Sequence, residues 1–271
     1  MFGPSYSCIS KTGIIYFTDC GANSLAVGLS QSDSKLIVLP AITAPCQPPK
    51  SMKLINTIYL PSFVHSVAKH NNILYVGLEN RKVMCSDRNV NTPALTEFAD
   101  VGGFVSSIEV YNNELYVLSA NAKKVVVYSL DKILKRSWSH NGHSGNFNKL
   151  RVINDQVFVP GRSQKSLAVY DLQGTLIKQI TCPTMSNNQK ALAVCGDDSF
   201  ILSDYGANSV SRININSGEV MWTSKHVQRP LGVVCYKSRY VLVTNQNSNT
   251  RIWILDINTG KFLCEFLLSN P

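Results

Sequence analysis

Six short apolar segments recur along this chain at nearly regular intervals, and this repeat constrains the fold more than any other feature. Each segment is rich in Val, Ile, Leu or Tyr, and their central residues are Tyr16, Tyr75, Tyr116, Phe158, Ile201 and Val241. The intervals between these residues are 59, 41, 42, 43 and 40. Turn residues flank the segments, which favours short strands over helices. A period in the low forties with four strands in each unit is the length of a β-propeller blade.

The repeat therefore predicts an all-β fold, a single six-bladed β-propeller of four-stranded antiparallel blades. The expected blades are residues 5–60, 61–101, 102–143, 144–183, 184–226 and 227–271. Blade one contains a Pro-rich insertion near residues 40–52, and Pro removes backbone donors that a strand ladder needs. Either Lys35–Leu39 or Ile55–Leu60 completes this blade. Because each blade uses its strands in sequence order, we expect ring closure to depend on side-chain packing between blades one and six.

Turn and aromatic residues recur at matching places in the expected blades. Fourth strands follow Gln173-Gly174, Ser217-Gly218 and Thr259-Gly260, which are good hairpin turns. Trp138 and Trp222 occupy matching fourth strands, where aromatic side chains can fill the space between neighbouring blades. We expect both tryptophans to pack between blades.

Two turns between second and third strands are near-duplicates, Asp19-Cys-Gly-Ala-Asn-Ser-Leu25 and Asp204-Tyr-Gly-Ala-Asn-Ser-Val210. With Leu-Tyr-Val before such turns, the chain resembles the NHL repeat, whose pattern is a strand, Asp-x-Gly-x-Asn-Arg and an apolar strand. The resemblance covers six blades. Ser24 and Ser209 stand where the motif has Arg, whereas a basic residue is supplied in other blades by Lys82, Lys124 and Arg251.

The resemblance implies a recognition module. NHL propellers often form the C-terminal domain of tripartite-motif (TRIM) ubiquitin ligases and of related translational repressors. It implies RNA binding as in such regulators, or, as the alternative, recognition of a ubiquitin-ligase substrate. Any ligase activity would then lie in domains outside this chain.

No constellation of residues indicates catalysis, so we expect a binding module rather than an enzyme. Asp19 and Asp204 are expected to accept backbone N–H groups in the turns that follow them. His140 and His143 form a short pair that would need His65 or His226 as a third metal ligand. A metal-dependent propeller lyase or hydrolase is the remaining alternative, and we expect no cofactor, catalytic residue or metal ligand.

The eight cysteines include no Cys-x-x-Cys pair. Cys8, Cys195 and Cys235 fall late in first strands of different blades, where side chains do not normally touch. We therefore expect small buried thiols in a reducing, cytoplasmic compartment rather than disulfides. No apolar run reaches the ~18 residues of a membrane helix, and Met1 is not followed by the pattern of a signal peptide.

The net charge of +9 favours an anionic partner. In a propeller, the loops before first strands and the turns between second and third strands share one face. Basic residues with aromatic neighbours on this face suit phosphate contact and base stacking, although some of their side chains could pack structurally. The candidate binding residues are Arg81, Lys82, Lys123, Lys124, Lys149, Arg162, Lys165, Lys190, Tyr205, Arg229 and Arg251.

RNA on this basic face is the expected partner, and a protein ligand on the same face is the alternative. The propeller itself is expected to be a monomer without membrane contact.

Overall fold

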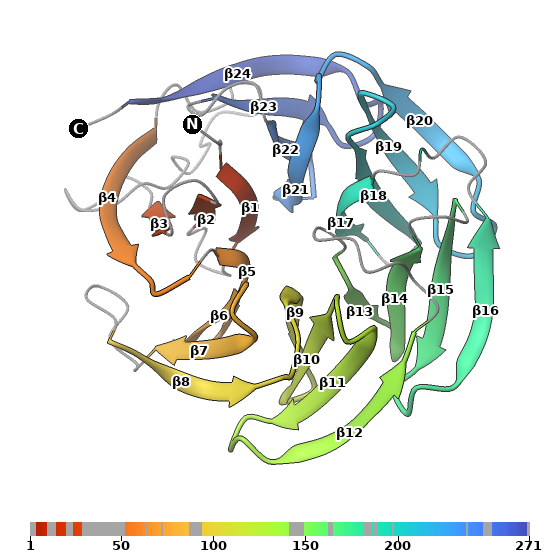
Figure 1. Cartoon of the computed structure of the whole chain (residues 1–271). Helices are drawn as coiled ribbons and strands as arrows, with labels where there is room; N and C mark the ends of the chain where they lie inside the picture. The colour runs from red at the N-terminus through yellow and green to blue at the C-terminus, as the bar shows by residue number, and fades with distance from the viewer. Residues whose placement is uncertain are drawn as a thin grey trace.

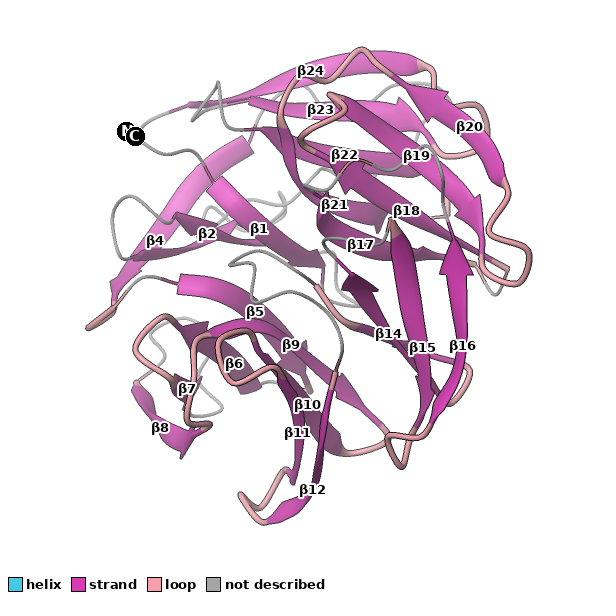
Figure 2. Cartoon of the chain, turned by 45° about the vertical axis from the view of Figure 1, so that its right-hand side comes forward, coloured by secondary structure: helices cyan, strands magenta, loops and turns pink. Residues whose placement is uncertain are grey.

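The computed structural model is a ring of antiparallel β-sheets around a central channel (Figure 1). The residues that it describes are 4–9, 15–19, 24–28, 52–62, 64–71, 73–86, 94–140, 149–161, 165–181, 186, 189–196, 198–236, 238–245 and 251–269. In each group of four consecutive strands, the first strand stands beside the channel and the fourth lies at the rim, and Figure 2 shows the ring obliquely. The prediction of an all-β propeller is confirmed.

Four of the sheets contain four strands each, and all neighbouring strands within them are antiparallel. The second blade consists of β5 (Val64–His70), β6 (Ile73–Leu78), β7 (Lys82–Ser86) and β8 (Leu95–Asp100). The third consists of β9 (Val105–Tyr111), β10 (Glu114–Ser119), β11 (Lys124–Ser129) and β12 (Leu134–Ser139). The fourth consists of β13 (Arg151–Ile153), β14 (Gln156–Gly161), β15 (Ser166–Asp171) and β16 (Leu176–Thr181). The fifth consists of β17 (Gln189–Cys195), β18 (Ser199–Asp204), β19 (Ser209–Asn214) and β20 (Val220–Ser224).

The remaining eight strands form one continuous sheet that joins the two ends of the chain. One half is β1 (Pro4–Ile9), β2 (Ile15–Asp19), β3 (Ser24–Gly28) and β4 (Met52–Tyr59). The other half is β21 (Pro230–Tyr236), β22 (Tyr240–Asn245), β23 (Arg251–Asp256) and β24 (Phe262–Ser269). The prediction of six separate blades is therefore wrong, because the ring has five hydrogen-bonded sheets, one of them of eight strands.

A parallel pairing between two outer strands fuses these halves. Leu268 of β24 pairs with Met52 of β4, and Ser269 pairs with Lys53. The fusion is possible because β24 spans eight residues and so extends past its own hairpin partner. Backbone hydrogen bonding thus contributes to ring closure, which we had expected from side-chain packing alone. The structure also assigns Met52–Tyr59 as the fourth strand after the insertion, while Lys35–Leu39 lies outside the described residues.

The second strands carry the core because both of their faces are covered by neighbouring sheets. Every residue of β18 is buried, whereas β16 at the rim exposes most of its residues. Tyr75, Tyr116 and Phe158, which define the repeat, are among the largest fully buried side chains. Apolar residues of adjacent sheets interdigitate there, so each sheet is stabilised by its two neighbours rather than by itself.

A glycine in one sheet meets a large side chain in the preceding sheet at three successive joints. Gly174, Gly218 and Gly260 occupy the turns between third and fourth strands, with φ values of 92°, 74° and 68°. A Cβ atom on them would lie 2.4 Å from Trp138, 2.6 Å from Ile180 and 2.4 Å from Trp222 respectively. The expected packing of both tryptophans between blades is confirmed.

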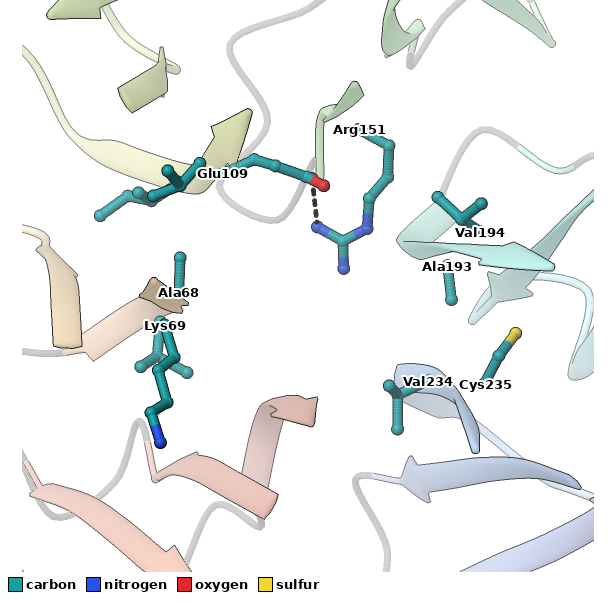
Figure 3. A pocket seen from close by; sticks show the side chains of 11 residues that line it. Ala68, Lys69, Glu109, Arg151, Ala193, Val194, Val234 and Cys235 are labelled. Atoms are coloured by element: carbon teal, nitrogen blue, oxygen red, sulfur yellow. Dashed lines mark hydrogen bonds and ion pairs between the residues drawn. The ribbon is translucent and has the colours of Figure 1, made fainter. Parts of the chain in front are cut away.

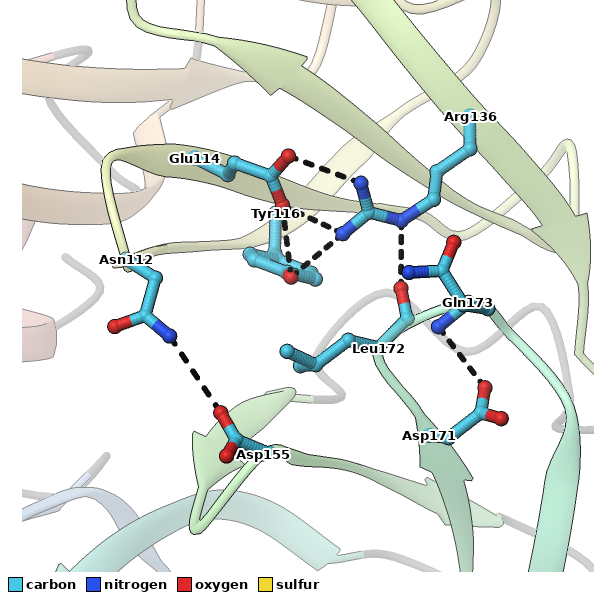
Figure 4. A network of polar contacts seen from close by, with 8 residues as sticks. All are labelled: Asn112, Glu114, Tyr116, Arg136, Asp155, Asp171, Leu172 and Gln173. Carbon is cyan, nitrogen blue, oxygen red and sulfur yellow. Dashed lines mark hydrogen bonds and ion pairs between the residues drawn. The ribbon is translucent and has the colours of Figure 1, made fainter.

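Polar contacts reinforce the joint between the third and fourth blades (Figure 4). Arg136 of β12 donates from Nη1 and Nη2 to the two carboxylate oxygens of Glu114, at 3.0 and 2.5 Å. Its Nη2 also donates to the Tyr116 hydroxyl at 2.8 Å, and its Nε donates to the Leu172 carbonyl at 2.6 Å. The hydrogen bond from Arg136 lowers the pKa of Glu114, while burial raises the pKa of Tyr116 to about 12. Glu114 and Tyr116 thus orient Arg136 within its own sheet, and its bond to the Leu172 carbonyl ties that sheet to the next one.

We predict that Gly260→Ala destabilises the ring far more than Gly102→Ala. Both glycines have a positive φ, but a Cβ on Gly260 would overlap Trp222, whereas nothing lies within 4 Å of a Cβ on Gly102. We expect losses of unfolding free energy of about 2–4 kcal/mol for Gly260→Ala and about 1 kcal/mol for Gly102→Ala. Urea denaturation measures both, and equal losses would show that the glycine–tryptophan contact is unimportant.

Candidate functional site

The ring has two faces, which the connections between strands define. Face A carries the turns between second and third strands and the connections from each fourth strand to the next first strand. These connections bind one another, as in the bonds from Val101 N to Arg81 O at 3.0 Å and from His140 N to Lys123 O at 3.0 Å. Face B carries the hairpin turns at the opposite ends of the strands, and there Ile257 N donates to Arg239 O at 2.9 Å.

Two of the predicted binding residues on face A are engaged with carboxylates. Arg81 Nη2 lies 3.0 Å from Asp100 Oδ2, and Lys82 Nζ lies 2.6 Å from Glu97 Oε2. All four side chains are substantially exposed, so these pairs add little stability. They do neutralise the positive charge of the second blade on this face.

Lys149 is the predicted residue whose environment differs most from the expected one. Its side chain is buried, and its Nζ donates to the carbonyl oxygens of His65 and Ser106. The ammonium group thereby links the first strands of three successive blades. It is not placed to contact an RNA phosphate, because it is buried between backbone acceptors. The prediction failed here because the sequence pattern does not distinguish an interior lysine from a surface one.

Four predicted residues present exposed basic side chains on face A. Lys123 and Lys124 lie at the turn between β10 and β11, Lys165 lies just before β15, and Arg229 lies just before β21. Tyr205 is partly buried in the turn after β18. The side chains of Arg162, Lys190 and Arg251 lie outside the described residues.

A left-handed backbone conformation recurs at one position of these turns. Arg81, Lys123, Lys165 and Asn208 each precede a third strand, and their φ values are 75°, 48°, 48° and 50°. Asn adopts this conformation readily, whereas a long side chain does so at a cost of roughly 1 kcal/mol. Three successive blades therefore hold a basic residue where the turn itself favours Asn or Gly.

A cavity of about 310 Å³ lies in the central channel toward face B (Figure 3). First strands of the blades line it, because β5, β9, β13, β17 and β21 all stand beside the channel. Its walls are mostly small or aliphatic, and they include three charged side chains. The lining residues are Val67, Ala68, Lys69, Ile108, Glu109, Val110, Arg151, Ala193, Val194, Val234 and Cys235.

Glu109 and Arg151 form an ion pair across two first strands in this cavity. Arg151 Nη1 lies 3.1 Å from Glu109 Oε2, and the two side chains are 19% and 22% exposed. Burial raises the pKa of Glu109, although the Arg151 charge and hydrogen bond act in the opposite direction. The cavity thus combines aliphatic lining residues with an arginine whose carboxylate partner is harder to ionise because it is buried.

Two thiols meet beside this cavity. A hydrogen bond from Cys235, the largest influence, and the Arg212 charge lower the pKa of Cys195 to about 6, while the same contact and burial raise the pKa of Cys235. The expectation that cysteines of different blades do not touch is therefore wrong for this pair. Both are free thiols, as are Cys85 and Cys264 among the described residues, and Cys8 has no described side chain.

The duplicated aspartates and the histidines have structural surroundings. Asp204 Oδ1 accepts from Ala207 N at 3.0 Å, so its predicted turn role is confirmed, while the side chain of Asp19 lies outside the description. His65 packs on Phe104 at 4.2 Å between ring centroids, and His226 stacks on Phe262 at 3.9 Å. Over the described part of the chain, no three His, Cys, Asp or Glu side chains group as a metal site would require.

Sequence reasoning missed Glu109, Arg151 and Lys69. A usable signal was present: first strands consist of small and apolar residues around the channel, and charged residues within them interrupt this pattern. Strand register then shows that Glu109 and Arg151 stand opposite Tyr116 and Phe158 of the repeat, at the same level of two neighbouring blades.

Comparisons with known proteins agree with the fold. The family model described as outer membrane protein assembly factor BamB matches residues 48–263. Virginiamycin B lyase from Staphylococcus aureus has a similar structure, with a TM-score of 0.69 and 13% identity, covering 99% of this chain and 85% of that one. A chain of the nidogen/laminin complex has a TM-score of 0.72 and 10% identity, covering 94% of this chain and 92% of that one. The WD40 β-propeller domain of Doa1 has a TM-score of 0.69 and 11% identity, covering 99% of this chain and 87% of that one.

No curated protein sequence matches the chain. The similar structures show the propeller fold alone at these identities, and they do not show an NHL repeat. They correct our expectation that the chain is not an enzyme, because lyases are among the proteins that share its fold. In the described residues, no helix is long and apolar enough to cross a membrane.

We predict that Lys149→Met destabilises the ring, since the two carbonyl groups lose a charged donor while the side-chain volume is kept. A loss of about 1–3 kcal/mol in unfolding free energy is expected. Lys124→Met, which removes an exposed lysine of the same face, should change it by less than about 0.5 kcal/mol. Denaturant titration distinguishes the variants, and a harmless Lys149→Met would place this lysine at the surface in solution.

Acid should destabilise the fold through two buried histidines. Burial and, to a smaller extent, the positive charge of Lys149 lower the pKa of His65 to about 3. Burial and, to a smaller extent, the charge of Lys123 lower the pKa of His140 to about 4. In the unfolded chain these two histidines bind protons below about pH 6.5, whereas in the folded chain they stay neutral. The free energy of unfolding therefore falls as the pH decreases below about 6.5. Between pH 7.5 and pH 5, each histidine should contribute a loss of about 1–2 kcal/mol. Denaturation at both pH values, with His65→Gln reducing the difference, tests this; equal stability contradicts it.

Proposed function

This chain belongs to the family of the outer membrane protein assembly factor BamB, and from that premise we propose that it is a protein-interaction module that binds an acidic partner segment on face A. The observation that carries the proposal is the set of exposed basic side chains of Lys123, Lys124, Lys165 and Arg229 on the connections of that face. They are separate from the two ion pairs of the second blade.

Backbone geometry supports a role for these side chains. Lys123 and Lys165 occupy equivalent left-handed positions, at φ 48°, where the fifth blade has Asn208. A lysine costs roughly 1 kcal/mol more than glycine in this conformation. Among the described residues, neither lysine side chain forms a hydrogen bond or an ion pair, and both are exposed, so what they contribute is positive charge on face A. Residues in such conformations concentrate at functional sites.

The charge balance favours an acidic partner. The chain carries a net charge of +9, and positive surfaces attract negative partners over distances of about a Debye length. Proteins with a similar fold include a chain of the nidogen/laminin complex, so protein binding is compatible with this architecture. RNA on the same face, as the NHL resemblance implies, is the second anionic partner that the experiment must separate.

We predict that the double change Lys123→Asn with Lys165→Asn abolishes partner binding without unfolding the ring. Asn suits the left-handed turns, so the unfolding free energy should stay equal or rise by up to about 1 kcal/mol for each site. Affinity purification with nuclease-treated extract compares the wild type, the double variant and Lys261→Asn. This control removes one positive charge from an exposed lysine on face B.

A specific protein retained by the wild type and by Lys261→Asn, but lost by the double variant, is the expected result. Its affinity should fall as salt rises, as an ionic interface requires. Equal retention by all three proteins contradicts the proposal. Tight, salt-sensitive binding of a uridine oligonucleotide that Lys123→Asn with Lys165→Asn removes, with no nuclease-resistant protein partner, would favour RNA instead.

A further inference from the structure

The geometry of the channel points to a ligand site: we propose that the cavity near face B binds a small organic carboxylate, with its carboxylate on Arg151 and its apolar part against the aliphatic wall. This site lies on the other side of the ring from the proposed interaction surface. Its test is therefore independent of the partner experiment.

The cavity lies at one level of the described first strands, where small residues stand beside two charged ones. In the pairing of first and second strands, Ala68, Glu109, Arg151, Ala193 and Cys235 stand opposite the repeat residues Tyr75, Tyr116, Phe158, Ile201 and Val241. They are thus equivalent residues of five successive blades. Three are small, and the two charged ones lie side by side and contact each other. Open volume remains next to the guanidinium (Figure 3).

Arg151 retains donors that the described part of the protein does not use. Its Nη1 donates to Glu109 Oε2 at 3.1 Å and to the Leu150 carbonyl at 3.2 Å. Among described residues, neither its Nε nor its Nη2 has an acceptor, and the guanidinium extends toward the open part of the cavity in Figure 3. A guanidinium fork matches a carboxylate in a bidentate arrangement, which makes a carboxylate a fitting occupant.

Charge around the cavity also favours an anion. Arg151 faces one carboxylate among the described lining residues, that of Glu109. Glu109 is held less strongly in its charged form, because burial raises its pKa. A partly buried guanidinium whose carboxylate partner is harder to ionise is stabilised by a second anion.

The walls define the rest of the ligand. Val67, Ile108, Val110, Val194 and Val234 contribute aliphatic surface, and the volume of about 310 Å³ is at the lower end of the range for small-molecule pockets. A compact acid with one apolar group satisfies both features. A large or multiply charged ligand would leave charges against valine side chains.

Isothermal titration of the purified full chain with benzoate tests the proposal, with benzamide as the neutral control of the same shape. Benzoate should bind saturably in the millimolar range or tighter, and at least tenfold more tightly than benzamide. Arg151→Gln should weaken benzoate binding at least tenfold. Lys135→Gln, which removes an exposed charge from the rim strand β12, should leave it unchanged.

Val234→Phe provides a test that keeps every charge, since the larger ring occupies the cavity and should also abolish binding. It guards against the possibility that Arg151→Gln fails to fold, which circular dichroism and thermal unfolding would reveal. Absence of saturable benzoate binding overturns the proposal. Equal affinity for benzamide, or binding that survives both Arg151→Gln and Val234→Phe, overturns it as well.

Discussion

The contact between a large side chain at the rim of one blade and a glycine in the next blade is the interaction on which the ring depends. At three successive joints, Trp138, Ile180 and Trp222 fill the space that a Cβ atom would otherwise take. The sheets can approach closely only because those glycines have no side chain and accept a positive φ. Hydrogen bonds from Arg136 and Trp222 to carbonyls of the following blade reinforce two of these joints.

Close approach at the rim has a consequence at the centre, where the first strands must share a narrow channel. Serine hydroxyls there bind the next blade directly: Ser66 Oγ accepts from Ile108 N at 2.9 Å, and Ser107 Oγ accepts from Leu150 N at 3.1 Å. Lys149 and the Glu109–Arg151 pair add charged groups to this interior. Burying a charged side chain is costly unless it is paired, so a buried charged residue in this channel suggests a role beyond packing.

Turn chemistry made much of the fold predictable. The Gln173-Gly174 and Thr259-Gly260 turns and the carboxylate of Asp204 in its turn depend on local backbone preferences, which a sequence expresses directly. The packing of Trp138 and Trp222 was predictable from their matching places in the repeat. The parallel pairing of β24 with β4 was not predictable in this way, because it joins residues more than two hundred positions apart. It turned two expected sheets into one.

The sequence by itself determined the repeat and the strand-and-turn order, because these follow from short-range periodicity and from the conformations that Gly, Asn and Asp allow. Only the tertiary structure decided that Lys149 is buried, that Arg81 and Lys82 are paired, and that Glu109, Arg151 and Lys69 surround one cavity. The physical reason is that burial and charge pairing depend on distances between blades. Ring closure sets those distances, and no local stretch of sequence contains them.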